Sequence, residues 1–172
     1  GAKFTRIYTL ADKSIDVEVE ENGSTFMENA IIKARAIAEI ANMPALADDS
    51  GLCVDALNGE PGVYSARYSG ARCDSKANNE LLLSKLSEVQ ERDRSARFKC
   101  AVALVYPNGD IVTAEGAAEG VITRDYCGDG GFGYDPIFYS LDLNKTFAEA
   151  SEEEKNAVSH RGRALAALVD KL

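Results

Sequence analysis

The chain has 172 residues, of which 45% are hydrophobic, and a formal net charge of −9. This length suggests one domain, or two tightly joined lobes, with enough apolar side chains for a substantial core. The acidic balance argues against a general nucleic-acid binder or a membrane-surface binder, because either would carry a basic patch. It does not exclude a small anionic ligand, since local charge can oppose the net charge.

We expect neither a transmembrane helix nor a signal peptide, because no apolar run is long enough. The four cysteines form no C-x-x-C pair and the chain has a single histidine, so a zinc site is not expected. Cys53 and Cys100 lie in apolar runs and are typical of buried small side chains. We therefore expect free thiols in a reducing compartment, the cytoplasm.

Strand and helix patterns are mixed along the chain. In order, they predict a strand over 15–20, a helix over 25–42, strands over 44–48 and 52–57, a helix over 75–89, strands over 95–106 and 111–123, a glycine-rich loop over 128–133 and a helical C-terminal segment. Thr25 and Glu28 fit a capping box, and Asn58-Gly59 predicts a tight turn. We expect an α/β protein with a central twisted mixed sheet.

Three carboxylates form the first candidate site. Glu28 lies in the first turn of a predicted helix, and Asp48-Asp49 ends the strand that follows that helix. An αβ unit can bring a helix start near a strand end, and Mg²⁺ prefers carboxylate oxygens together with waters and phosphates. The alternative is structural: Glu28 completes the capping box, and the aspartates cap the turn at Ser50-Gly51.

The glycine-rich stretch GDGGFGYDP, residues 128–136, forms the second candidate site. Its glycines let the backbone approach a ligand closely, and the rings of Phe132 and Tyr134 alternate with them. Exposed rings suit a planar base, and Asp135 before a proline is held extended. The alternative is a tight hairpin whose aromatic rings pack inward.

Basic residues form the third candidate set. Ser159 can cap the last helix, which places His160 and Arg161 in its first turn, where a cation opposes the helix dipole. Ser151 is the other possible cap in the helical C-terminal segment. A cation in this unfavourable position favours a role in ligand binding over a purely structural role for the histidine. Lys33, Arg67 and Arg72 are further cations, for which an ordinary solvated side chain is the alternative.

Four stretches, taken together, resemble the inosine/xanthosine triphosphate pyrophosphatases, which remove deaminated purine nucleotides. They are STFMENAIIKARAIA, LADDSGLCVDALNGEPGVYSARYSG, GGFGYDPIF and EEKNAVSHRGRAL, in that order. The resemblance runs from about residue 16 to the C-terminus, and four ordered blocks are far more specific than a single motif. It implies an elongated two-lobed fold with a central groove, a homodimer, and Mg²⁺-dependent hydrolysis of ITP, dITP and XTP to the monophosphate and pyrophosphate.

The resemblance also implies roles for individual residues. Asp49 would be the catalytic acid/base residue and, with Glu28, a metal ligand. The substrate-binding residues would be Lys33 and Ser50 at the phosphates, Phe132, Gly133, Tyr134 and Asp135 at the nucleoside, and Lys155, His160 and Arg161 at the base. Donors such as Arg161 would bind the C6 oxygen of hypoxanthine or xanthine and leave the amine of adenine unpaired.

The chain departs from the family pattern at its N-terminus. The family begins with a strand, a phosphate loop of the form [ST]-x-N-x-x-K and a helix, whereas residues 1–172 read as a single domain that lacks them. We therefore expect weak or no turnover from this chain. The alternative function is a non-catalytic nucleotide-binding module with the same fold.

Overall fold

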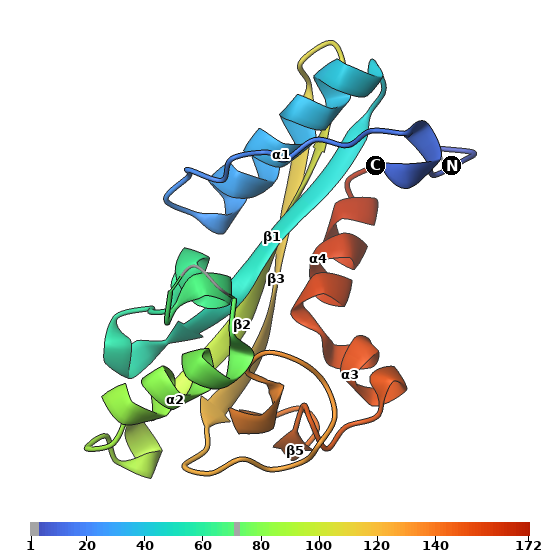
Figure 1. The fold of residues 1–172 in the computed structure, drawn as a ribbon. Helices are drawn as coiled ribbons and strands as arrows, with labels where there is room; N and C mark the ends of the chain where they lie inside the picture. The colour runs from blue at the N-terminus through green and yellow to red at the C-terminus, as the bar shows by residue number, and fades with distance from the viewer. Residues whose placement is uncertain (1–3, 71–72) are drawn as a thin grey trace.

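The computed structural model describes residues 4–70 and 73–172. Three long strands form the spine of an elongated molecule (Figure 1), namely β1 (Ala45–Val54), β2 (Ser95–Val105) and β3 (Ile111–Ile122). Two short strands, β4 (Phe138–Ser140) and β5 (Lys145–Thr146), complete a sheet in the order β1-β2-β3-β4-β5.

The α/β class is confirmed, but the expectation of a mixed sheet is wrong for the described residues. Each described pair of neighbouring strands is antiparallel. The strands neighbour one another in sequence order, and a turn closed by Tyr106 and Asp110 joins β2 directly to β3. Such a short connection allows only antiparallel pairing, since a parallel pair needs a crossover of a dozen residues or more.

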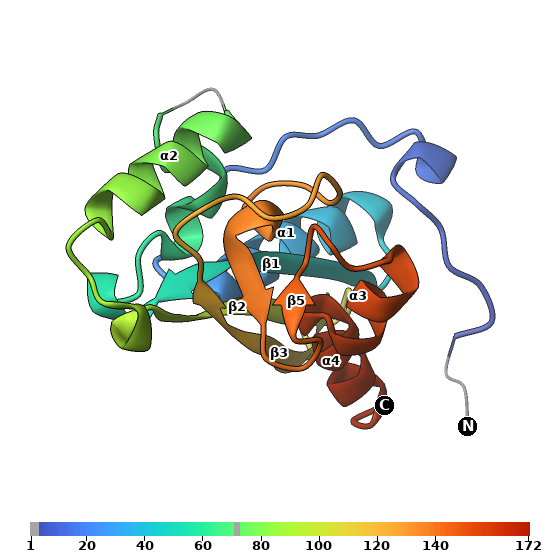
Figure 2. The same cartoon turned by 90° about the horizontal axis from the view of Figure 1, so that it is seen from below.

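Two helices cover opposite faces of the long strands. Figure 2 shows α1 (Phe26–Ala41) on one face and α4 (His160–Val169) on the other. Residues of β2 alternate between them: Ala101 and Ala103 pack in a cluster with alanines of α1, whereas Val102 and Leu104 pack in a cluster with α4. Because both faces of β2 are buried, the end of this strand is continuously apolar.

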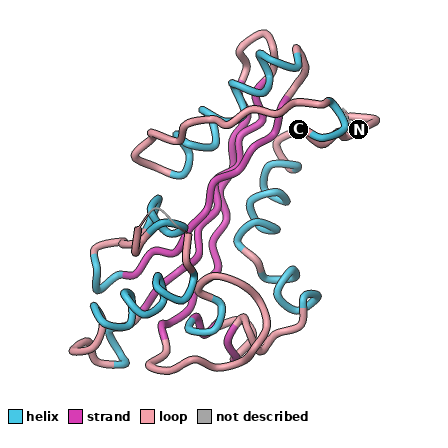
Figure 3. The backbone as a smooth tube through the Cα atoms, viewed as in Figure 1, coloured by secondary structure: helices cyan, strands magenta, loops and turns pink. Residues whose placement is uncertain are grey.

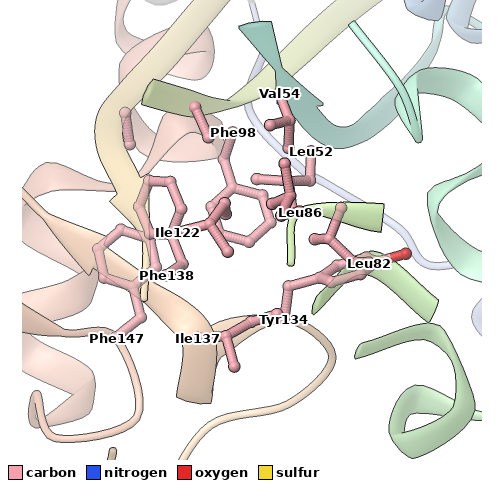
Figure 4. Packing of buried hydrophobic residues seen from close by; sticks show 12 residues of the cluster. Leu52, Val54, Leu82, Leu86, Phe98, Ile122, Tyr134, Ile137, Phe138 and Phe147 are labelled. Atoms are coloured by element: carbon pink, nitrogen blue, oxygen red, sulfur yellow. The ribbon is translucent and has the colours of Figure 1, made fainter. Parts of the chain in front are cut away.

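A third apolar cluster fills the other end of the molecule, where loops and short elements gather (Figure 3). It joins the ends of the long strands to α2 (Ser75–Lys85) and to the segment around β4 and β5. Figure 4 shows Phe98, Phe138 and Phe147 packed beside Tyr134 and Leu82. The short helix α3 (Glu152–Val158) connects this end to α4.

Several local predictions are confirmed. Both candidate caps are used, since Ser151 forms a capping box for α3 and the Ser159 side chain accepts from the Gly162 amide at the start of α4. Asn58 and Gly59 both take positive φ in the predicted turn. The cysteines are free. Within residues 4–70 and 73–172, no helix has the length and apolarity needed to cross a bilayer.

Other local predictions are wrong. Residues 15–20 form no strand, because no neighbouring strand pairs with their alternating pattern in the described structure. The strands predicted over 44–48 and 52–57 are the single strand β1, which pairs with β2 through Ser50 and Gly51 without a break. The helix predicted over 75–89 ends as α2 at Lys85.

Candidate active site

Strand β1 presents its two adjacent aspartates to opposite faces of the sheet. Asp49 lies opposite Ala101, on the face covered by α1, and Asp48 lies opposite Val102, on the face covered by α4. Successive residues of a strand point to opposite faces, so the pair cannot act as one carboxylate cluster. Each aspartate therefore has its own set of partners.

The partners of Asp49 come from α1. Asn29 Nδ2 donates to Asp49 Oδ2 at 3.0 Å, and Lys33 Nζ lies 3.7 Å from Asp49 Oδ1. Burial raises the pKa of the Asp49 carboxyl above its ordinary value, while the Asn29 hydrogen bond and the Lys33 charge lower it. A carboxylate whose pKa is raised by burial is a better general base than an exposed one.

Glu21 joins this group, although the sequence analysis did not identify it. Its Oε1 lies 2.8 Å from Lys33 Nζ, and its charge acts to raise the pKa of Asp49. Glu21 directly follows residues 15–20, an alternating acidic run that was predicted as a strand, and it lies five residues before α1. An acidic run close to a predicted helix start was the sequence feature from which Glu21 could have been identified.

Glu28 lies apart from these contacts. Its carboxylate accepts from the Ser24 amide at 2.6 Å and the Ser24 hydroxyl at 2.8 Å, and these bonds lower its pKa. Thr25 accepts from the Glu28 amide, as half of a capping box requires. Its role as a metal ligand stays a prediction, and the geometry favours Glu21 in its place.

A cavity of about 850 Å³ opens on the other side of β1. Its lining contains the following residues that the sequence analysis selected: Ser50, Phe132, Gly133, Tyr134, Asp135, Lys155, His160 and Arg161. Lys33 and Asp49 are outside the lining, but Ser50 follows Asp49 directly on β1. The structure thus brings the predicted nucleoside and base residues together and places the acidic group next to them.

The glycine-rich loop is held to α3 by a buried carboxylate. Asp135 is 2% exposed, and it accepts from the Phe132 amide at 2.9 Å and from Lys155 Nζ. Lys155 Nζ also lies 4.4 Å from the centre of the Phe132 ring, which is 75% exposed. An exposed ring with one face beside a cation offers its other face for stacking.

Tyr134 has a more internal position than the sequence analysis expected. Its ring is 6% exposed within the apolar cluster of Figure 4, and its hydroxyl donates to the Ser65 carbonyl at 2.7 Å. Burial raises the pKa of this hydroxyl. Tyr134 therefore braces the cavity wall, and a direct contact with a nucleoside stays a prediction.

The two residues at the start of α4 have different surroundings. His160 stacks on Phe98 with ring centroids 5.1 Å apart, and within the described residues its buried Nδ1 has no hydrogen-bond partner. Burial, with the charges of Arg161 and Lys155, lowers the pKa of His160 to about 4, so the ring is neutral at pH 7. A buried nitrogen without a partner in a cavity wall suits a ligand group.

Arg161 is compensated by the first aspartate of the pair. Its Nε donates to Asp48 Oδ2 at 2.9 Å, which offsets the unfavourable position of a cation at a helix start. Of the other candidate cations, Arg67 lies over the Tyr64 ring at 5.2 Å. Arg72 lies outside the described residues.

The donors near Asp49 suit a metal that takes few protein ligands. Among residues 4–70 and 73–172, no three side chains of the His, Cys, Asp and Glu types gather as a complete metal cage. Asp49 and Glu21, both beside Lys33, offer two carboxylates. Mg²⁺ is typically held by one or two carboxylates together with substrate phosphates and waters, so this donor set fits Mg²⁺.

Comparisons with known proteins show which sequences and structures this chain is similar to. A model of the Ham1 family matches residues 2–171. A dITP/XTP pyrophosphatase of Desulforamulus reducens is 59% identical over 86% of this chain and 74% of that protein. One of Geobacter sulfurreducens is 54% identical over 100% of this chain and 86% of that protein. The structure of the Staphylococcus aureus Ham1 protein has a TM-score of 0.88 and 46% identity, and covers 94% of this chain and 83% of its own.

Proposed function

This chain belongs to the Ham1 family, and on that premise we propose that it hydrolyses the deaminated purine nucleotides ITP, dITP and XTP to the monophosphate and pyrophosphate. One observation carries the proposal: the cavity lined by His160, Arg161 and the Phe132 loop also includes Ser50, which directly follows the half-buried Asp49 on β1. Relatives named for dITP and XTP support the same substrate class.

Asp49 is the proposed general base. It accepts a proton from the water that attacks the α-phosphorus, and its raised pKa suits this task. Lys33, 3.7 Å from Asp49, binds a phosphate oxygen and offsets its charge. Asp49 and Glu21 would hold a divalent ion, for which we propose Mg²⁺, and the bound ion would supply further charge neutralisation at the phosphates.

The base is recognised at the start of α4. The guanidinium of Arg161 donates to the C6 oxygen of hypoxanthine or xanthine, whereas the amine of adenine would face that donor without an acceptor. The neutral His160 offers its Nδ1 nitrogen, which has no partner among the described residues, to the base edge. The exposed ring of Phe132 stacks on the purine, and Lys155 fixes the loop through Asp135.

Three wider features belong to the proposal. They are a single catalytic domain over residues 1–172, expected from the length; a homodimer, implied by the family resemblance; and a cytoplasmic location, expected from the cysteines. Sedimentation of the purified chain would measure the oligomeric state. The expectation of weak turnover also stays a prediction, which the assay below measures directly.

The test is pyrophosphate release from ITP, XTP, ATP and GTP, with and without Mg²⁺. We expect release from ITP and XTP, and its loss in Asp49→Asn with no change in folding. Asp93→Asn, the same change at an exposed aspartate, is the matched control. Calorimetric binding of ITP without any release by the wild type would instead support the non-catalytic module.

A further inference from the structure

We propose that Asn29 is a positioning residue for Asp49, which it holds so that only the Oδ1 atom of that carboxylate is free to face the reacting water. This inference rests on the proposed function of Asp49. Asn29 itself touches neither the water nor the phosphate in this proposal. It acts through the orientation of the Asp49 side chain.

The orientation of the Asn29 amide is defined by its partners. The Gly23 amide donates to Asn29 Oδ1 at 2.8 Å, and a backbone N–H can only donate. The oxygen of Asn29 therefore faces Gly23, and its NH₂ group must face Asp49 Oδ2, 3.0 Å away. A flipped amide would place two donors together at Gly23 and two acceptors together at Asp49.

The surroundings leave this amide little freedom. Asn29 is 2% exposed, and it lies four residues before Lys33, on the same face of α1. A Cβ atom added at Gly23 would lie 2.6 Å from Asn29 Oδ1 and 2.8 Å from the Glu28 Cβ. Glycine at this position thus allows the backbone to approach closely enough to hold the Asn29 oxygen.

The consequence is a difference between the two oxygens of Asp49. Oδ2 is occupied by Asn29, whereas Oδ1 is 3.7 Å from Lys33 Nζ, beyond a direct hydrogen bond. In the proposed step, the water oxygen bonds to the α-phosphorus and one water proton passes to Asp49 Oδ1. The bond from the α-phosphorus to the bridging oxygen breaks, and pyrophosphate leaves with that oxygen.

The first test is Asn29→Asp, which keeps the shape and the acceptor for Gly23 but replaces the amide donor to Asp49 with a second carboxyl group. We expect kcat for ITP to fall by about 10- to 100-fold with KM within about threefold, because a misoriented base impairs only the chemical step. Asn42→Asp makes the same change at the exposed end of α1 and should leave both constants unchanged. An unchanged kcat in Asn29→Asp, or a change in KM alone, would overturn the proposal.

The second test does not depend on turnover. If Asn29→Asp and Asp49→Asn are combined, the donor and acceptor are exchanged and the contact is restored. We expect urea unfolding to show that the double variant is more stable than the combined effects of the two single variants predict, by about tenfold in the unfolding equilibrium constant. Turnover should stay absent. Additive single effects would refute the contact.

These two tests separate the possible failures. A wild type without ITP hydrolysis would refute the proposed function, while coupling in urea would still support the Asn29 contact. Gly23→Ala provides a further variant if Asn29→Asp does not fold. Its added Cβ displaces the Asn29 amide, so we expect the same fall in kcat at constant KM, and an unchanged kcat would contradict the proposal.

Discussion

Asp48 and Asp49 are neighbours on β1, but their carboxylates bind partners on opposite sides of the sheet. Asp49 contacts Asn29 and Lys33 of α1, and Asp48 pairs with Arg161 of α4 at 2.9 Å. Through two adjacent residues of one strand, the dipeptide therefore contacts both α1 and α4, the helix that we propose binds the base. Each carboxylate thus has a partner, which offsets the cost of placing two adjacent charges on a packed strand.

Removing the Asp48 charge should weaken base selection more than turnover. In Asp48→Asn, Arg161 loses the charged partner that orients its guanidinium toward the cavity. We expect the ratio of kcat/KM for ITP to that for ATP to fall by about tenfold, with kcat for ITP within about threefold.

Asp142→Asn provides the control for this prediction. It breaks a comparable exposed ion pair with Arg163, on the same helix α4. We expect it to leave the ratio unchanged. An equal loss of selection in both variants would assign the effect to the general stability of α4.

Gly116→Ala should separate α4 from β3. A Cβ atom at this position would overlap the His160 carbonyl oxygen and the Ala164 amide. The helix must shift, and the base-binding residues must shift with it. We expect a lower melting temperature and a KM for ITP raised by about tenfold. Calorimetric binding of ITP as tight as in the wild type would contradict this assignment.

Arg94 stabilises the end of the molecule opposite the α1 end. It is 2% exposed and donates to the carbonyls of Leu86, Ile122 and Thr123. Arg94→Met would remove the side-chain donors of the Ile122 and Thr123 carbonyls, whereas the Leu86 carbonyl still accepts from the Val89 amide. We therefore expect about 3 kcal/mol of lost unfolding free energy in urea. Arg92→Met, at an exposed arginine two residues away, should change it by less than about 0.5 kcal/mol.

Protonation of His160 should destabilise the fold. Its pKa is about 4 in the folded chain and about 6.5 when unfolded, so the unfolded state binds more protons between these values. The unfolding free energy should therefore fall as pH decreases below 6.5, by up to about 1.4 kcal/mol per pH unit. His160→Phe retains the stacking position on Phe98 and removes this slope. The unfolding free energies of both proteins would be measured in urea from pH 7 to 5. Identical slopes against pH would contradict the prediction, because His160 would then be readily protonated in the folded chain.

The local signals that sequence analysis used were reliable where the physical cause was local. Ser151 and Ser159 cap their helices because a hydroxyl at that position bonds the free amides of the first turn. The assignment of Glu28 as a metal ligand stays a prediction, since a carboxylate in a helix start has two possible partners. The capping interaction with Ser24 prevails over a contact with Asp49.

Glu21 and Asn29 show what the sequence pattern could not reveal. Glu21 lies outside α1, and only the path of the chain before the helix brings it to Lys33. Asn29 is an ordinary polar residue in a helix until α1 packs on β1 and buries it against Asp49. Partners that are far apart in sequence are selected by packing, which no local pattern encodes.

By itself, the amino-acid sequence determined the α/β class, the helix caps and the tight turns, and it pointed to eight of the residues that line the cavity. The antiparallel order of the sheet and the division of Asp48 from Asp49 were decided only by the tertiary structure. The physical reason is that strand register and the two-residue alternation of a strand assign each side chain to a face. The helix that covers each face then decides the partners, so that Asp49 contacts Asn29 and Lys33 of α1 while Asp48 contacts Arg161 of α4.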